Sequence, residues 1–262
     1  PRYSDIDTGA MAAAAVDIAV RHAVATGVDY NHLAILDNFC WPKVDRPESR
    51  GALVRTCRGA YDTAMAYGLP FISGKDSLNN EFVMSSQEAA RTGLPERIAI
   101  PYTLLVSAIG IVDDVTRCVT MDTKSDGNVL AIASAPCDQV GLVPAYANHV
   151  RVSKLIRNGK VAAAHDVNDG GLAVAVAEMS IASQRGASVM VSHEAYSASL
   201  FEPLAGTYVL EMSREDAEAE GLTIVGTVTT TDRLTIDINE TRAVDLSLTE
   251  LDRAWRTGLR MN

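Results

Sequence analysis

Two polar stretches punctuated by glycine interrupt a chain that is otherwise rich in Ala, Val, Ile and Leu. Pro70–Glu81 reads PFISGKDSLNNE, and His165–Leu172, about ninety positions later, reads HDVNDGGL. Each stretch follows an apolar run, Leu69–Ile72 and Val161–Ala164, that we interpret as a buried strand. Open α/β folds bind their ligands at strand ends of this kind. The two stretches therefore predict an α/β architecture with ligand-binding loops.

Composition argues against several classes of function. The 262 residues carry a formal net charge of −10, which argues against a nucleic-acid partner because phosphate backbones require basic patches. Apolar stretches such as Tyr102–Val112 are far shorter than the ~20 residues of a membrane span, so we expect no membrane partner. We recognise no leader sequence. The cysteines form no C-x-x-C pair, which argues against a structural zinc site, and we expect a cytoplasmic protein.

Alternating helical and strand patterns divide the chain into two parts. In the first part, helices are predicted over Gly9–Thr26 and Gly51–Tyr67, and strands over His32–Leu36 and Ile98–Val112. A turn-rich region near residues 113–122 separates this part from a second series of elements. That series comprises strands at Val129–Ala133, Ser188–Val191, Thr207–Met212, Leu222–Val228 and Arg233–Ile238, and helices at His149–Arg157, Leu172–Ser183 and Leu248–Thr257. We predict two domains, 1–116 and 117–262, of α/β and α+β type.

The first polar stretch carries groups that suit an anionic ligand. Gly74 permits a positive φ or a close backbone approach, Lys75 can neutralise phosphate, and Asp76 could hold a metal or orient the lysine. The spacing excludes a Walker A loop, because Gly68 and Gly74 are six apart rather than five and no Ser or Thr follows the lysine. An ordinary polar turn with a solvated lysine is the alternative. The candidate binding residues here are Ser73, Gly74, Lys75, Asp76, Ser77 and Asn79.

The second polar stretch suits a metal-bound phosphate. Mg²⁺ takes one or two protein carboxylates together with phosphate oxygens and water, and Asp166 and Asp169 are available for that role. Two glycines before a predicted helix would leave its first N–H groups open to an anion. Helix capping by Asp169 is the alternative, and we interpret His165 as a residue that supports the ligand-binding groups or packs, rather than as a general base. The candidates are Asp166 for the metal, and Asn168, Asp169, Gly170 and Gly171 for nucleotide or substrate.

Both stretches, in this order and at this separation, resemble phosphoribosylformylglycinamidine (FGAM) synthase and, more widely, the aminoimidazole ribonucleotide synthetase-like superfamily. The likeness covers nearly the whole chain. It extends to LAILDNFCWP (33–42), PFISGKDSLNNEF (70–82), IPYTLLVSAIGIVDDV (100–115), HDVNDGGLAVAVAEM (165–179) and the final TELDRAW (249–255).

The resemblance implies an architecture and a reaction. The chain would be the second of two tandem A–B modules, with an A-type α/β domain whose strands pair into a dimeric β-barrel and a B-type α+β domain. The reaction would convert FGAR, ATP and glutamine into FGAM, ADP, phosphate and glutamate, with Mg²⁺ as cofactor. The partners would be the first half of the synthetase, or a second copy of this chain, and a glutaminase that supplies ammonia.

The sequence departs from that family where the second nucleotide site is expected. The resemblance implies a Glu and an Asn, four residues apart on the first helix, that help bind Mg²⁺, but Ile18 and His22 hold these positions. Isoleucine cannot ligate a metal, and a packing role is the alternative for the histidine. Cys137–Ala147 replaces a longer glycine-rich stretch, and residues 200–206 read LFEPLAG where an LFNE-like segment is expected. The resemblance thus implies a site that is weak or lost.

Three hypotheses follow. The chain is half of an ATP-dependent amidoligase that cannot complete the reaction alone, or it is an inert scaffold that keeps the fold for assembly. Mg²⁺-dependent nucleotide affinity distinguishes these two. The third hypothesis is another enzyme of the superfamily, for example a selenophosphate synthetase-like protein, but no cysteine precedes Cys40 to serve as its reactive residue.

Overall fold

The computed structural model describes residues 2–134, 142–192 and 199–258, which form two compact units. The first unit comprises Pro1–Val20 and Leu33–Ile109, and the second comprises Arg21–His32 and Gly110–Asn262. The helix α1 (Thr8–Ala25) therefore contributes its last turns to the second unit. The domain division at 116 and 117 stays a prediction. No helix in the described residues has the length and apolar character that a membrane crossing requires.

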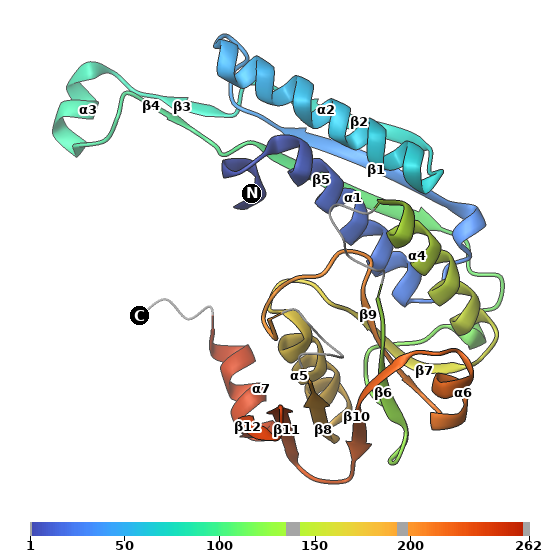
Figure 1. Cartoon of the computed structure of the whole chain (residues 1–262). Coiled ribbons are helices and arrows are strands. Elements are labelled where there is room, and N and C mark those ends of the chain that lie inside the picture. The colour runs from blue at the N-terminus through green and yellow to red at the C-terminus, as the bar shows by residue number, and fades with distance from the viewer. Residues whose placement is uncertain (1, 135–141, 193–198, 259–262) are drawn as a thin grey trace. The chain divides into compact units, whose positions relative to one another are not determined.

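The first unit is built on a small sheet with the strand order β2-β1-β5 (Figure 1). The strands are β1 (Leu33–Cys40), β2 (Phe71–Ser77) and β5 (Thr103–Gly110), and β1 and β2 run parallel. The helix α2 (Pro47–Tyr67) starts with proline in its first turn and ends at Gly68, whose left-handed φ of 63° closes the last turn. The core is aliphatic and aromatic, with the fully buried Trp41 stacked on Tyr102 at 4.7 Å between ring centroids.

Helices α1 and α2 cross closely because glycines meet at the contact. A Cβ on Gly59 would lie 2.4 Å from the carbonyl oxygen of Gly9, so no larger residue fits there. Hydroxyl groups join the helices beside this contact: Thr8 donates to the Ala52 carbonyl at 3.1 Å, and Thr56 donates to the Thr8 carbonyl at 3.2 Å. The first turns of α1 thus pack directly on α2.

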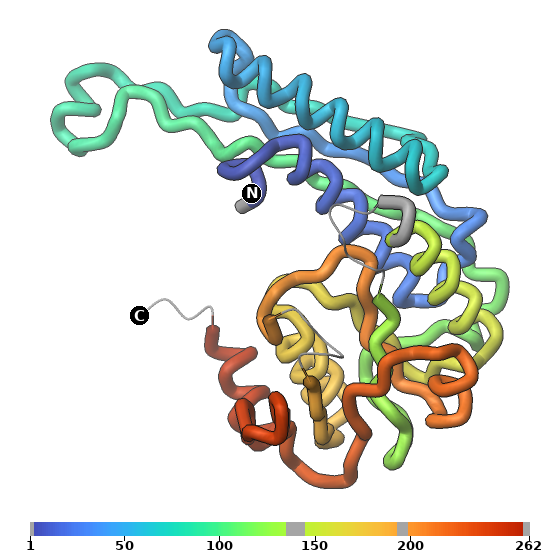
Figure 2. The backbone as a smooth tube through the Cα atoms, in the orientation of Figure 1, coloured from blue at the N-terminus to red at the C-terminus, as the bar shows by residue number. Residues whose placement is uncertain are grey.

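A short excursion interrupts the first unit between β2 and β5. It comprises β3 (Glu81–Val83), α3 (Ser86–Thr92) and β4 (Arg97–Ala99), and Figure 2 traces it away from the sheet and back. The helix α3 begins with a capping box between Ser85 and Glu88. The long strand predicted over Ile98–Val112 is wrong as a single element. Proline at 101 supplies no N–H to a ladder, and the chain forms β4 and β5 on either side of it.

The second unit is a mixed sheet, within the described residues, of seven strands in the order β12-β11-β8-β10-β6-β9-β7. All of its strand pairs are antiparallel except β8 with β11. The strands are β6 (Val129–Ala133), β7 (Val161–Asp166), β8 (Gly186–Val191), β9 (Tyr208–Met212), β10 (Thr223–Thr229), β11 (Arg233–Ile238) and β12 (Thr241–Ser247). The helices are α4 (Leu142–Arg157), α5 (Gly171–Ser183), α6 (Arg214–Ala219) and α7 (Leu248–Thr257).

The apolar helix α5 forms the centre of the second unit's core. Leu172, Val176 and Met179 are fully buried against residues of β6, β8, β9 and β11. This packing fixes the first turn of α5 beside the end of β7, which is where the second polar stretch lies. The sequence missed α6 and β12, and it placed the start of α4 too late. Of the shortened stretch Cys137–Ala147, residues 137–141 lie outside the described part of the chain.

Candidate functional site

The strand β7 ends at Asp166, whose carboxylate is bound by a buried arginine. Arg21 of α1 donates from its Nη1 to Asp166 Oδ2 at 2.8 Å and to the Val167 carbonyl at 3.1 Å. Arg21 is 2% exposed and Asp166 is 5% exposed, so this ion pair is almost completely removed from water. The residue predicted to bind a metal therefore already holds a cation supplied by the chain itself.

Two histidines surround the same carboxylate. His22 Nε2 lies 3.5 Å from Asp166 Oδ2, and His165 Nδ1 lies 3.6 Å from Oδ1. Burial alone would raise the pKa of Asp166, but His22, Arg21 and His165 outweigh it and hold the pKa below its usual value. The Asp166 carboxylate is therefore ionised, and its three neighbours Arg21, His22 and His165 stabilise the negative charge.

His165 itself sits between two acceptors. Its Nδ1 lies 2.7 Å from the Asp166 carbonyl oxygen, and its Nε2 lies 3.0 Å from a carboxylate oxygen of Glu178 on α5. Both ring nitrogens therefore face oxygen atoms, an arrangement that favours the doubly protonated imidazolium. Burial would lower the pKa of His165, but the Glu178 carboxylate and the Asp166 carbonyl raise it above its usual value. The sequence interpretation of His165 as a supporting or packing residue named neither of these partners.

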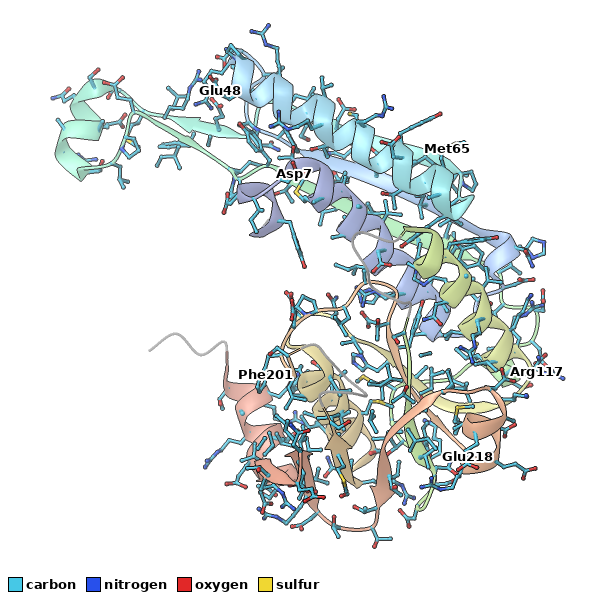
Figure 3. The ribbon with its side chains drawn as sticks, viewed as in Figure 1. Asp7, Glu48, Met65, Arg117, Phe201 and Glu218 are labelled. Atoms are coloured by element: carbon cyan, nitrogen blue, oxygen red, sulfur yellow. The ribbon has the colours of Figure 1, made fainter. Side chains whose placement is uncertain are left out.

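The first turn of α5 is occupied by the chain's own backbone. Gly171 N donates to the Asn168 carbonyl at 2.8 Å, and Ala173 N donates to the Leu200 carbonyl at 3.0 Å. A Cβ on Gly171 would lie 2.4 Å from the Leu200 oxygen, so glycine makes room for the segment that carries Phe201 (Figure 3). The expectation that the glycines leave the first N–H groups open is wrong for these two groups. The capping alternative is also wrong in detail, because the cap residue is Gly170 rather than Asp169.

A cavity of about 490 Å³ opens beside this ion network. His22, His165 and Asp166 line it, together with Thr120 and Asp122 from the segment before β6. Lys124 Nζ lies 2.7 Å from the Thr120 hydroxyl and 2.7 Å from an Asp122 carboxylate oxygen. The charged groups at the cavity wall thus already lie beside groups of opposite charge.

The first polar stretch is a strand rather than a loop. Residues 73–77 belong to β2, where Lys75 pairs with Asn38 and Ser77 with Cys40 of β1. Pairing with the buried strand β1 supplies the backbone hydrogen bonds that extend the strand through these polar residues. Ser73, Gly74, Lys75 and Asp76 are exposed. Lys75 Nζ donates to the Ser77 hydroxyl at 2.6 Å, so the lysine lies along the strand surface. Asn79 follows the strand end.

Gly74 leaves room for the side chain of its neighbour on β1. It lies opposite Asp37, and a Cβ at this position would come within 2.2 Å of Asp37 Oδ1. Gly74 is not among the glycines with positive φ, so the first of the two alternatives given for it, a positive φ, does not apply. The residue serves close packing against a carboxylate.

Asp37 is a candidate that the sequence analysis did not select. It lines a largely apolar cavity of about 350 Å³ together with Phe39, Cys57, Tyr61 and Phe71. Burial raises the pKa of Asp37, and the nearby charge of Asp76 adds to the shift. A signal existed, because Asp37 ends an apolar run in the same way as the residues of the two polar stretches.

Comparison with known proteins places the chain in a family. Residues 129–239 match the family model described as "AIR synthase related protein, C-terminal domain". PurL subunits of phosphoribosylformylglycinamidine synthase are 31% identical: one from Brucella ovis over 97% of this chain, and one from Chelativorans sp. over 83%. The chain belongs to the family of AIR synthase-related proteins that includes PurL. It spans only 36% and 31%, respectively, of those two relatives.

Solved structures share the fold of this AIR synthase-related chain. The structure titled "T. maritima PurL complexed with ADP" superposes with a TM-score of 0.68 at 15% identity, over 95% of this chain and 42% of that chain. Hydrogenase maturation protein HypE superposes with a TM-score of 0.62 at 15% identity, over 90% of this chain and 82% of that chain. The AIR synthase-like fold expected from the sequence is therefore confirmed, and the dimeric barrel stays a prediction.

The residues at the second polar stretch do not fit the Mg²⁺ that the family resemblance implies. Mg²⁺ requires near-octahedral oxygen ligands, but the Asp166 carboxylate faces Arg21 and His22, and Ile18 offers no ligand atom. Across the described residues no three His, Cys, Asp or Glu side chains form a group suited to a metal. The side chains at this loop, among the described residues, therefore do not form a suitable set of Mg²⁺ ligands.

Proposed function

We propose that this chain is the second A–B module of an FGAM synthase, which converts FGAR to FGAM with ATP and glutamine. The observation that supports this function best is the 31% identity to PurL subunits across 97% of the chain. Solved PurL structures of T. maritima carry ATP, ADP and FGAR in their titles, so the proposed substrates are a purine nucleotide and FGAR. The chain supplies part of the enzyme, because it spans about a third of its curated relatives.

The exposed strand β2 is the proposed ligand-facing element. Ser73, Lys75 and Asp76 present a hydroxyl, a cation and a carboxylate to solvent from a rigid sheet. Phosphoryl transfer relies on positioning and on neutralisation of phosphate charge, and Lys75 supplies such a charge. In this proposal the Mg²⁺ that accompanies ATP is held by the first half of the enzyme.

The sheet of the first unit is the proposed assembly surface. Along β5, Leu104 points into the core, while Leu105 and Ile109 are 54% and 57% exposed. A sheet with an exposed apolar face favours pairing with a related sheet. We therefore propose that this face pairs with the first half of the synthetase, or with a second copy, to form the shared barrel. A glutaminase is the third proposed partner, and a complex titled "Structure of PurLQS from Thermotoga maritima" supports a multi-subunit assembly.

Reconstitution tests this function. The chain is mixed with the part of Brucella ovis PurL to which it does not align, and ADP release is measured with FGAR, ATP and ammonium chloride. We expect no release from the chain alone and FGAR-dependent release from the mixture. Leu105→Arg is expected to abolish the gain, whereas Val54→Arg, an exposed site on α2, is expected to leave it unchanged. FGAR-dependent release by the chain alone would contradict the half-module proposal.

An inert structural half is the second candidate function. It is favoured by the ion pair of Arg21 with Asp166 and by the backbone that covers the first turn of α5. A mixture that assembles, as judged by size-exclusion chromatography, but whose activity is unaffected by Lys75→Ala or Asp76→Ala would support this candidate.

A further inference from the structure

We propose that the Arg21 guanidinium takes the place of a divalent cation at the loop after β7, so that this site works without metal. The inference deepens the proposed function, on which it rests for the identity of the ligand, a nucleotide. The contact itself, between α1 and the end of β7, depends on no ligand. The inference is drawn from the atoms that surround the Asp166 carboxylate.

Arg21 makes the contacts that a bound metal would make. One nitrogen of the guanidinium donates both to a carboxylate oxygen and to the backbone carbonyl of Val167. Carboxylate and carbonyl oxygens are the ligands of hard divalent cations in proteins. Arg21 thus fixes the loop as such a cation would, and with a charge that cannot dissociate.

The groups around Asp166 disfavour a second cation of higher charge. Oδ2 of Asp166 is approached by Arg21 at 2.8 Å and by His22 at 3.5 Å. The other carboxylate oxygen faces His165, whose remaining nitrogen contacts Glu178. A divalent ion here would displace one of these partners and bury like charges together, which is unfavourable in a poorly hydrated site. Glu178 is committed to His165 and does not complete a metal site.

The substitution pattern of α1 agrees with this geometry. Isoleucine at 18 offers no ligand atom, and Arg21 places a permanent cation against the Asp166 carboxylate that a divalent ion would need. Loss of a metal ligand alone would leave Asp166 buried without a counter-charge. The buried arginine removes that penalty, so the pair is a replacement of the metal rather than simple decay.

Titration with Mn²⁺ alone, followed by electron paramagnetic resonance, tests the replacement without any nucleotide. We expect wild-type protein to show no Asp166-dependent binding at about 1 mM Mn²⁺. The triple variant Ile18→Glu, Arg21→Ala, His22→Asn is expected to bind Mn²⁺ at least about tenfold more tightly than wild type. Arg185→Ala is the matched control, because it breaks a surface ion pair with Asp126 and should gain no metal affinity. Circular dichroism checks that each variant folds.

A wild-type Mn²⁺ site that disappears in Asp166→Asn would overturn the proposal. If the triple variant does not fold, Arg21→Lys serves instead, because a shorter cation loosens the loop while the charge is kept. Its Mn²⁺ binding should equal that of wild type if charge is what excludes the metal, and a gain of Mn²⁺ affinity by this variant would also overturn the proposal.

Calorimetric titration with ADP separates this inference from the proposed function. The dissociation constant should be the same in Mg²⁺ and in EDTA, within about twofold. A tenfold tightening by Mg²⁺ that Asp166→Asn abolishes would contradict the metal replacement. Absence of ADP binding in both conditions would count against a nucleotide site on this chain, while the Mn²⁺ titration would still decide whether arginine has replaced the metal.

Discussion

The strand 73–77 and the loop 165–171 hold their charged groups in opposite ways. On β2, Lys75 and Asp76 are exposed at the surface of a small sheet, and their interactions are short and local. In the loop, Asp166 is nearly buried and is bound by a side chain 145 positions away in the sequence. The first arrangement leaves charge available to a ligand, whereas the second uses its charge to hold the fold together. Similar patterns of Gly, Asp and polar residues therefore leave charge exposed in one unit and bury it in an ion pair in the other.

Removing the arginine should produce the largest difference between the two regions. Arg21→Met leaves a buried carboxylate without its counter-charge, and breaking a buried pair in this way costs about 3–5 kcal/mol of unfolding free energy. Asp166→Asn in the same chain should recover much of that loss, because neither partner then carries a buried charge. Urea denaturation of the two single variants and the double variant measures the coupling. Additive losses would show that the pair does not stabilise the loop as a unit.

Substitution of Gly171 and of Gly74 should give the next largest difference, in the free energy of unfolding, between the two regions. Gly171→Ala places a Cβ against backbone atoms of Leu200 and Phe201 at a φ of +63°, and we expect a loss of about 2–3 kcal/mol. Gly74→Ala meets the Asp37 carboxylate, which is the end of a side chain that can rotate, so the loss should be smaller. Asp37→Ala should relieve the second clash and leave the first unchanged. Equal losses for both glycines in the Asp37→Ala background would contradict the distinction between a backbone wall and a movable side chain.

Local signals predicted much of the fold, but not the site. The predicted helix Leu248–Thr257 matches α7, and Gly51–Tyr67 falls within α2, because caps at Ser247 and Gly68 mark their ends in the sequence. The strand through the first polar stretch depends on pairing with β1, a tertiary interaction that overrides the turn-like composition. The sequence shows Arg21 within an Ala-rich helix but does not show that this arginine is buried. Its partner, however, follows only from the packing of α1 against the end of β7.

The stability of the first unit, where Asp37 lies, should depend on the ionisation of this carboxyl and therefore on pH. Its folded-state pKa is raised by burial and by Asp76, so the ionised carboxylate destabilises the folded state. The stability that Asp37 contributes is present below its unfolded pKa, about 3.9, and is lost as pH rises through the folded value. Asp37→Asn should therefore stabilise the protein at pH 7 by less than about 1 kcal/mol, since the group keeps some contact with water.

The stabilisation expected from Asp37→Asn should vanish as the pH approaches 3. Thermal unfolding at pH 3 to 7, compared with Asp62→Asn on the exposed surface of α2, measures it. A gain that grows as pH falls would show that the sign of the Asp37 shift is wrong.

Lys75 should show the smallest effect on stability and is the sharpest test of what the exposed strand does. Lys75→Ala removes a solvent-facing cation that donates a hydrogen bond to the Ser77 hydroxyl. The free energy of unfolding should therefore change by no more than about 0.5 kcal/mol. If the strand faces phosphate, the same variant should slow ADP release in the reconstituted mixture by about tenfold, because charged hydrogen bonds contribute ~1.5–3 kcal/mol. Lys43→Ala, an exposed lysine of the same unit, is the control and should alter neither quantity. A stable Lys75→Ala protein with full activity would place the ligand elsewhere, and the two polar stretches would then differ only in burial and not in function.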